Sequence, residues 1–196
     1  MPDLTFSCTC GQVRGTVKGA GPGTGTALVC CCRYCRAAEV YLDQDDPGGD
    51  GVNIFQTTAD RVEITAGQER LDAFSFSDRG LVRWYARCCK APLFNTPRSA
   101  RWGMVSVMAD RIDGAGELGP IRAVLYEPQE SGKRKTTGAV RAVAGLLGRT
   151  AKMQITGGWK NSPLFGKSGR PVVKIAVLPD VVKSHLPLDE EAPLPR

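Results

Sequence analysis

The chain has 196 residues, and 42% of them are hydrophobic, which suits one domain with a buried core. The net charge of +6 is concentrated in residues 131–174, which contain ten Lys or Arg residues and no Asp or Glu. The first residues lack the basic and apolar pattern of a secretory signal, and no apolar run is long enough to span a bilayer. We therefore expect a cytoplasmic protein without a membrane span.

The N-terminal part contains a first pair of thiols, Cys8 and Cys10, followed by Gly11. A glycine at this position permits a turn that brings both sulfurs to one side. Residues 12–18 alternate apolar and polar side chains and predict a strand, and residues 27–30 predict a second strand after a loop rich in Gly and Pro. This second strand leads into the densest cysteine cluster of the chain.

Residues 28–36 hold four of the eight cysteines, and the useful spacing within them is Cys30-x-Cys32-x-x-Cys35. Three thiolates this close can converge on one tetrahedral Zn²⁺ with Zn–S bonds of about 2.3 Å. They cannot easily pair with one another, because a disulfide requires a restricted separation and orientation of its Cβ atoms. In a reducing compartment, clustered thiols are more often metal ligands than disulfides. We therefore predict that these three cysteines bind zinc.

The middle of the chain reads mainly as strands. Residues 39–43 are expected to form a strand, and residues 45–51 an acidic, flexible loop. Four further strands are predicted between Gly, Asp and Pro residues, over 61–65, 70–76, 81–87 and 102–108. A third thiol group, Cys88 and Cys89, follows the strand that ends at residue 87. These patterns favour an all-β fold built on antiparallel sheets.

The C-terminal part contains no cysteine, and it is predicted to hold a strand over 121–126, a helix over 137–148 and a strand over 170–178. The tail, 186–196, is rich in proline and is expected to fray. The helix has one apolar stripe, which we expect to dock on the domain and which comprises Val140, Val143, Ala144 and Leu147.

We divide the chain into a zinc-binding β domain, 1–126, and a basic extension with one short helix, 127–196, packed on the same domain. No nucleic-acid recognition motif accompanies the basic segment, so we interpret it as a solvated surface and do not expect nucleic-acid binding.

Three of these features together carry a resemblance to a known family. They are Cys8-x-Cys10-Gly11, Cys30-x-Cys32-x-x-Cys35-Arg36, and Cys89 before Pro92-Leu93-Phe94. Over about residues 5–113 the chain resembles the glutathione-dependent formaldehyde-activating enzymes and centromere protein V. The resemblance implies an all-β, tent-like arrangement of sheets with two zinc sites. One would be built from the first thiol pair and a later pair, and the second from the triplet, where the thiol of glutathione enters.

The chain departs from that family pattern around the later thiol pair. Ala86 stands where the family has a cysteine, and Lys90 where it has a turn glycine. Cys88 is the alternative ligand beside Cys89, although consecutive strand residues point to opposite faces, so a turn or bulge would be required. The family's central histidine is replaced by Cys31, which we expect to point outward.

Each of these extra thiols also has a non-functional interpretation, because cysteine is often a small buried hydrophobe. For Cys31 and Cys88, core residue and metal ligand stay equally open. The single histidine, His185, lies far along the chain from every cysteine and is not expected to be a ligand. The predicted metal ligands are Cys8, Cys10, Cys30, Cys32, Cys35, Cys88 and Cys89.

The two predicted sites differ in charge and openness. Four thiolates around Zn²⁺ leave two negative charges, which Arg87 and Lys90 could offset. Three thiolates leave one negative charge and an open position, which catalysis requires. Arg33 and Arg36 flank the triplet and could offset its charge or hold an acidic thiol such as glutathione.

Two functions follow from these predictions. The first is a zinc-dependent carbon–sulfur lyase that acts on glutathione–aldehyde adducts such as S-hydroxymethylglutathione, with Cys30, Cys32 and Cys35 as the catalytic residues. Its partners would be a small thiol or an aldehyde adduct. The alternative is a non-catalytic, zinc-stabilised β-fold module that binds a protein or an acidic partner through the basic extension.

Overall fold

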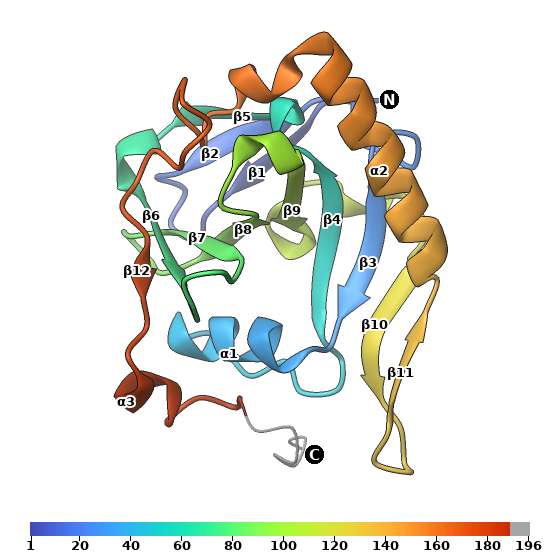
Figure 1. Ribbon diagram of the computed structural model, residues 1–196, viewed down its shortest axis with the longest axis vertical. Helices are drawn as coiled ribbons and strands as arrows, with labels where there is room; N and C mark the ends of the chain where they lie inside the picture. The colour runs from blue at the N-terminus through green and yellow to red at the C-terminus, as the bar shows by residue number, and fades with distance from the viewer. Residues whose placement is uncertain (189–196) are drawn as a thin grey trace.

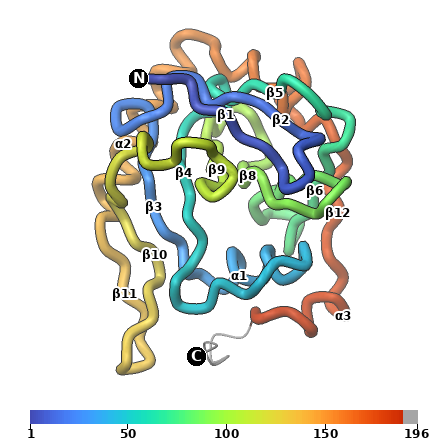
Figure 2. The backbone as a smooth tube through the Cα atoms, turned by 180° about the vertical axis from the view of Figure 1, so that it is seen from behind, coloured from blue at the N-terminus to red at the C-terminus, as the bar shows by residue number. Residues whose placement is uncertain are grey.

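The computed structural model describes residues 1–188, which form two β-sheets and three α-helices. The smaller sheet is antiparallel and contains β1 (Leu4–Ser7), β2 (Arg14–Val17) and β5 (Val62–Ala66), in that order. It lies on the back of the molecule, as Figure 2 shows. The mostly β architecture that the sequence predicts is therefore confirmed.

The larger sheet has nine strands in the order β11-β10-β3-β4-β9-β8-β7-β6-β12. Its pairs are antiparallel except for β10 with β3 and β12 with β6, which are parallel. Its strands are β3 (Thr26–Cys30), β4 (Val52–Thr58), β6 (Leu71–Ser75), β7 (Val82–Ala86), β8 (Pro92–Thr96), β9 (Met104–Met108), β10 (Ala123–Pro128), β11 (Arg134–Thr137) and β12 (Ala176–Val177).

The main core fills the space between the two sheets. Phe6 of β1 meets Phe94 of β8 edge to face, with ring centroids 5.2 Å apart. Trp84 of β7 is 1% exposed, and its indole N–H donates to the hydroxyl of Thr96 over 2.8 Å. Aromatic side chains of this size bury the most apolar area per residue, so they hold the two sheets together.

Three helices lie around the sheets: α1 (Arg33–Tyr41), α2 (Ala139–Thr156) and α3 (Asp180–Lys183). Figure 1 shows α1 across the end of the molecule to which β3 points, and α2 as an outer layer over β3 and β4. Within the described residues, no helix has both the length and the hydropathy needed to cross a membrane.

The expected strand over 39–43 is wrong, because these residues include the end of α1. One face of this helix packs against β6. Its Ala37, Ala38 and Leu42 are buried with Phe74, and the ring of Tyr41 lies 4.5 Å from that of Phe74. This burial overrides the local β preference of Val40 and Tyr41.

The expectations for the C-terminal part are corrected in two further ways. The strand over 170–178 is reduced to Ala176–Val177, because the backbone of Val172 bonds instead to the carbonyl of Leu164. The helix is longer than predicted and ends only at Gly157, whose φ of 70° stops it. Of the tail expected to fray, residues 186–188 are described and residues 189–196 lie outside the described part.

The expected docking of the α2 stripe is also wrong. The residues of α2 that are buried are Ala142 and Met153, on the opposite side of the helix. Val140, Val143 and Leu147 are instead 86%, 53% and 64% exposed. The extension nevertheless belongs to the same body, because β10 runs through residue 126 and β11 and β12 join the large sheet.

Candidate metal centres

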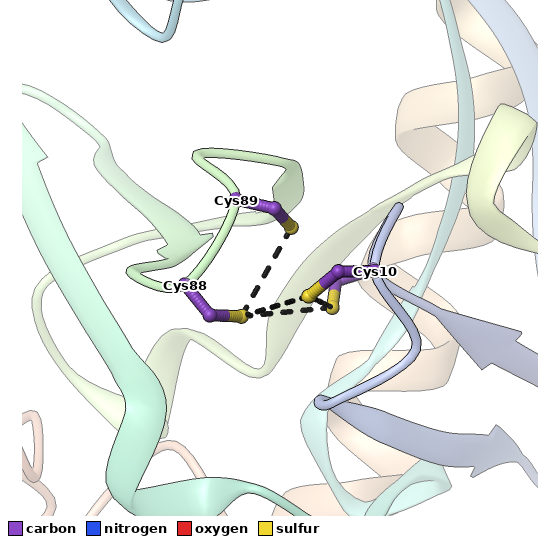
Figure 3. Close-up of side chains that lie close together, drawn as sticks. Cys10, Cys88 and Cys89 are labelled. Atoms are coloured by element: carbon purple, nitrogen blue, oxygen red, sulfur yellow. Dashed lines mark hydrogen bonds between the residues drawn. The ribbon is translucent and has the colours of Figure 1, made fainter.

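Four sulfurs from two distant segments meet in one group, formed by Cys8, Cys10, Cys88 and Cys89. All four lie within 4.8 Å of one another. The first pair comes from the turn after β1, and the second pair from the turn between β7 and β8, as Figure 3 shows for Cys10, Cys88 and Cys89. The structure thus brings together thiols that are 78 to 81 residues apart.

The spacing of these sulfurs suits a tetrahedral metal. Ligands at a Zn–S distance of about 2.3 Å in a tetrahedron have sulfurs about 3.8 Å apart. The closest pairs measure 3.3 Å for Cys10 and Cys88, 3.6 Å for Cys8 and Cys10, and 3.9 Å for Cys8 and Cys88. Cys88 and Cys89 are 4.0 Å apart. The donor set therefore fits one tetrahedral zinc ion with four thiolate ligands.

A turn, rather than a strand, positions the two consecutive cysteines. The backbone N–H of Ala86 bonds to the carbonyl of Ala91, and the N–H of Cys89 bonds to the carbonyl of Ala86. Lys90 adopts a φ of 56°, the left-handed conformation for which a glycine would usually be selected. This reversal lets Cys88 and Cys89 face the same centre. Ala86 itself is fully buried in the core and is not among the four thiol-bearing residues.

The protein prepares one thiol of this group to be deprotonated. Burial raises the pKa of Cys8, but the backbone N–H of Val13 and the neighbouring thiols outweigh it and lower the pKa to about 7. Burial and the thiols of Cys10 and Cys8 raise the pKa of Cys88 to about 12. Of these two thiols, Cys8 is therefore the easier to deprotonate.

The two basic residues expected to neutralise this group have other partners. The ammonium of Lys90 pairs with the carboxylate of Asp43, and the guanidinium of Arg87 donates to the carbonyl of Glu69. Arg111 contacts the turn that holds the first pair, because its Nη1 donates to the hydroxyl of Thr9 over 2.9 Å.

A second group contains the sulfurs of Cys30, Cys32 and Cys35, which also lie within 4.8 Å of one another. Three successive local structures position them. Cys30 ends β3, Cys32 is the N-cap of α1, and Cys35 lies in the first turn of that helix. Cys30 and Cys35 are buried, at 7% and 6% exposed, whereas Cys32 is half-buried. One edge of this group therefore faces the surface.

These three thiols stabilise one thiolate among them. The thiols of Cys30 and Cys35 donate to Cys32 and lower its pKa to about 2. The hydrogen bonds of Cys30 with Cys32 and Cys35 instead raise the pKa of Cys30 and keep its proton in place. The N-terminus of α1 adds to this effect, because the partial positive charge of a helix N-terminus favours a thiolate. The group is therefore prepared to bind a cation.

A buried guanidinium that the sequence analysis missed also contacts the triplet. Arg83 of β7 is 5% exposed, and its Nη1 lies 3.6 Å from the sulfur of Cys35. Its positive charge offsets the single negative charge that three thiolates and a divalent zinc would leave. The alternating pattern of residues 81–87 marks Arg83 as an internal strand position, but nothing in that pattern places it beside Cys35.

The fourth cysteine of the cluster does not belong to the group. Cys31 is 1% exposed, so the expectation that it points outward is wrong. Its sulfur lies 3.4 Å from the carbonyl oxygen of Gly49. A Cβ at Gly51 would lie 2.7 Å from this sulfur, so the glycine makes room for it. Burial raises the pKa of Cys31, which keeps the thiol protonated.

A groove of about 260 Å³ borders the exposed edge of the triplet. It is lined by Cys32, Arg33, Tyr34, Tyr126 and Arg134. The guanidinium of Arg33 stacks over the ring of Tyr34, 5.1 Å from its centroid. Arg134 comes from β11 and donates to the carbonyl of Cys31 over 3.3 Å. The C-terminal extension thus contributes to this site, which the sequence did not indicate.

Arg36, the second arginine predicted to flank the triplet, has a different environment. Its guanidinium makes a two-point ion pair with Asp46, with Nε to Oδ1 at 2.9 Å and Nη2 to Oδ2 at 2.7 Å. Its side chain is only 2% exposed. Arg36 therefore fixes the acidic loop to α1, and the groove is left to Arg33 and Arg134.

An acidic side chain lies on the other side of the triplet. Glu39 is one helical turn after Cys35, and both residues line a small cavity that Arg83 also lines. Burial, more than the nearby Asp110 and Cys35, raises the pKa of Glu39 to about 7. The i, i+4 spacing would have revealed this carboxyl if residues 39–43 had been interpreted as a helix.

The remaining candidate, His185, is exposed in the turn after α3 and belongs to neither thiol group. Within residues 1–188, the groups of metal-binding side chains that lie close enough to share an ion are the two cysteine groups alone.

Comparison with known proteins places the chain in a family. No curated protein matches it. A crystal structure of a Rhodobacter sphaeroides protein is similar with a TM-score of 0.44 and 20% sequence identity, over 60% of this chain and 96% of the other. Residues 3–176 match a protein family described as a family of unknown function, DUF6151. Because this match covers most of the sequence, including both cysteine groups, the chain belongs to the family of unknown function DUF6151.

Proposed function

We propose that this protein is a zinc-dependent carbon–sulfur lyase that acts on adducts between a small acidic thiol and an aldehyde, such as S-hydroxymethylglutathione. The observation that carries this proposal is the half-buried edge of the Cys30, Cys32 and Cys35 group on a groove lined by two arginines. The resemblance to the glutathione-dependent formaldehyde-activating enzymes supports the choice of substrate class.

The number of thiols separates the two groups by role. Four thiolates complete a tetrahedron, which is typical of a structural zinc site, whereas three leave one position for an exogenous ligand. Zinc bound by Cys30, Cys32 and Cys35 would supply a Lewis acid that holds an incoming thiol as a thiolate at neutral pH. The four-cysteine group would then stabilise the fold, and the three-cysteine group would carry the reaction.

The surrounding residues would hold and orient the substrate. Arg33 and Arg134 line the groove beside Cys32, so their positive charges suit the carboxylates of an acidic thiol. Arg83 lies on the buried side and offsets the negative charge of the thiolates. Burial of Cys30 and Cys35 keeps water away from the inner side of the site.

The proposed reaction is balanced without a redox partner. In the cleavage direction, the C–S bond of the hemithioacetal breaks, and its electron pair remains on the thiol sulfur. The hydroxyl proton passes to solvent, and the C–O bond becomes the carbonyl of the released aldehyde. In the reverse direction, the thiolate attacks the aldehyde carbon and the oxygen takes a proton from solvent. Such chemistry suits the reducing cytoplasm, where the thiols stay reduced.

One observation favours a second function, a non-catalytic zinc-stabilised binding module. The four-cysteine group links the turn after β1 to the turn between β7 and β8 and thereby joins the two sheets. Metal at this group would organise the fold without any reaction. The basic extension would then contact an acidic partner.

Cobalt substitution distinguishes these two functions. Thiolate-to-cobalt absorption of the cobalt-loaded protein should change when glutathione is added, because the thiol enters the open position. The change should vanish in Cys32→Ser, whereas Cys31→Ser serves as a matched control and should behave as the wild type. Formaldehyde release from S-hydroxymethylglutathione should follow the same pattern. A cobalt spectrum that ignores every small thiol would mean a closed site, and the binding-module function would replace the lyase.

A further inference from the structure

Helix α2 presents a row of apolar side chains to solvent. Val140, Val143, Leu147 and Ile155 are 86%, 53%, 64% and 87% exposed. With Ala151 between the last two, they recur every three or four residues and therefore share one face of the helix. Single exposed apolar residues are normal on a protein surface, but a continuous row marks an interaction site.

The opposite face of α2 fixes the orientation of this row. Ala142 and Met153 are 5% and 2% exposed, and Met153 packs so closely on Gly103 that a Cβ there would lie 2.5 Å from its terminal methyl. Arg149, on the same inner side, donates to the hydroxyl of Thr26 over 3.1 Å. These contacts hold the helix on β3 and β4, so rotating the apolar row inward would break them.

The two flanks of the row differ in chemistry. On one flank, the side chains of Thr150 and Gln154 bond to the backbone carbonyls of Trp102 and Arg101. These bonds bring the backbone of Trp102, whose side chain is 71% exposed, against this flank of the helix. On the other flank lie the exposed bases Arg141 and Lys152, because each residue of a helix is rotated by about 100° from the last. The surface is thus apolar in the middle, carries an exposed Trp along one flank and is cationic along the other.

A polar cavity of about 110 Å³ adjoins the cationic edge. Its charged lining consists of Arg61, Arg149 and Lys152 with one carboxylate, Asp60, so cations are in excess. The Nε of Arg149 is buried and finds no acceptor within the described part of the chain. The Oδ1 of Asp60 in the same cavity also has no hydrogen-bond partner among the described residues. The excess of cations and the free Nε of Arg149 suit a phosphate group, which supplies acceptor oxygens and negative charge.

We propose that this face of α2 binds the surface of an anionic phospholipid bilayer. The apolar row and Trp102 enter the interface between headgroups and acyl chains, and Arg141 and Lys152 contact headgroup phosphates. Interfacial helices combine these features, with apolar and Trp side chains on one face and Lys or Arg beside them. Anionic lipid further matches the segment 131–174, in which basic residues have no acidic neighbours in sequence.

Charge also argues against a second copy of the chain as the occupant. Two copies that covered their apolar rows with each other would bring Arg141 and Lys152 close to the same residues of the partner, and like charges repel. A bilayer that contains acidic lipid has the complementary charge. This inference concerns a surface on α2 and does not depend on the proposed reaction.

Vesicle co-sedimentation of the full-length, metal-loaded protein tests the proposal. The wild type should bind vesicles of phosphatidylcholine mixed with phosphatidylserine more tightly than pure phosphatidylcholine, and added salt should weaken this preference. The double variant Val143→Gln/Leu147→Gln should bind roughly tenfold more weakly because it loses the apolar contact. Arg141→Gln/Lys152→Gln should lose the preference for phosphatidylserine.

Two controls separate binding from misfolding. Val181→Gln changes an apolar side chain of α3 that is 68% exposed, and it should bind vesicles as the wild type does. Circular dichroism should show the same helix content in all variants, because every changed side chain is exposed. The proposal is overturned if the wild type ignores acidic vesicles, if Val143→Gln/Leu147→Gln binds them equally well, or if sedimentation shows a dimer that this double variant dissociates.

Discussion

The guanidinium Nη1 of Arg83 lies 3.6 Å from the sulfur of Cys35, in the interior between β7 and α1. Both side chains are buried, so their charges interact through protein rather than water. A fixed positive charge at this point favours thiolates over thiols throughout the three-cysteine group. Arg83 would thus support a metal held by these thiols without contacting it.

Replacing this arginine should weaken metal binding at the triplet alone. In Arg83→Met, the three thiols should release protons at higher pH, so cobalt loading of this group should shift to higher pH and its affinity should fall by about 10- to 100-fold. Arg83→Lys keeps the charge and should recover much of the loss. Arg87→Met, on the exposed side of the same strand end, is the matched control. Equal cobalt titrations in wild type and Arg83→Met would disprove this electrostatic role.

Metal content should separate the two cysteine groups. The wild type should carry two zinc ions per chain, Cys8→Ser and Cys32→Ser one each, and Cys31→Ser two, as measured by mass spectrometry of the purified protein. Cys8→Ser should also lower the Tm by roughly 10 °C, because losing a structural metal removes several kcal/mol of folding free energy. An unchanged Tm and zinc content in Cys8→Ser would show that the four-cysteine group binds no structural metal.

The ion pair between Arg36 and Asp46 should stabilise the protein by an amount that depends on pH. Asp46→Asn should lower the free energy of unfolding by about 1–3 kcal/mol, since it leaves a buried guanidinium without its partner. Arg36 lowers the pKa of Asp46 below its ordinary value of 3.8. The contribution is therefore complete above pH 3.8 and disappears as the pH falls through the lowered pKa. Denaturant unfolding of wild type and variant checks this, and a difference that persists at lower pH would contradict it.

Glu39 should have the opposite pH dependence. Its pKa is raised from 4.5 to about 7 in the folded chain, chiefly by burial. Between pH 4.5 and pH 7 the folded state therefore keeps a proton on Glu39 that the unfolded state has lost. Stability should therefore fall as pH rises through this window. Glu39→Gln should remove that slope and raise the free energy of unfolding at pH 8 by about 1–3 kcal/mol.

Wild type and variants must carry the same amount of metal in this comparison. The control must change a carboxyl that is not buried. Glu69→Gln serves as the control, because the side chain of Glu69 is 75% exposed. Its pH profile should parallel that of the wild type. If Glu39→Gln also keeps the wild-type slope, the carboxyl beside Cys35 is not the group that titrates.

The sequence by itself determined the three-cysteine group, because its ligands lie within six residues. A strand end, an N-cap and a first helical turn follow one another from Cys30 to Cys35, and such local geometry leaves little freedom. The periodicity of residues 61–65, 70–76 and 81–87 likewise predicted β5, β6 and β7, because a half-buried strand must alternate its side chains.

The contacts between distant segments were decided only by the tertiary structure. Cys88 joins Cys8 because a turn with a left-handed Lys90 reverses the chain, and no local pattern encodes that turn once the usual glycine is absent. Arg83 of β7 contacts Cys35 of α1, although the two residues are 48 positions apart in sequence. The orientation of α2 was decided in the same way. Its apolar stripe was visible in the sequence, but Met153 and Arg149 made the better fit to the sheet and left that stripe in solvent.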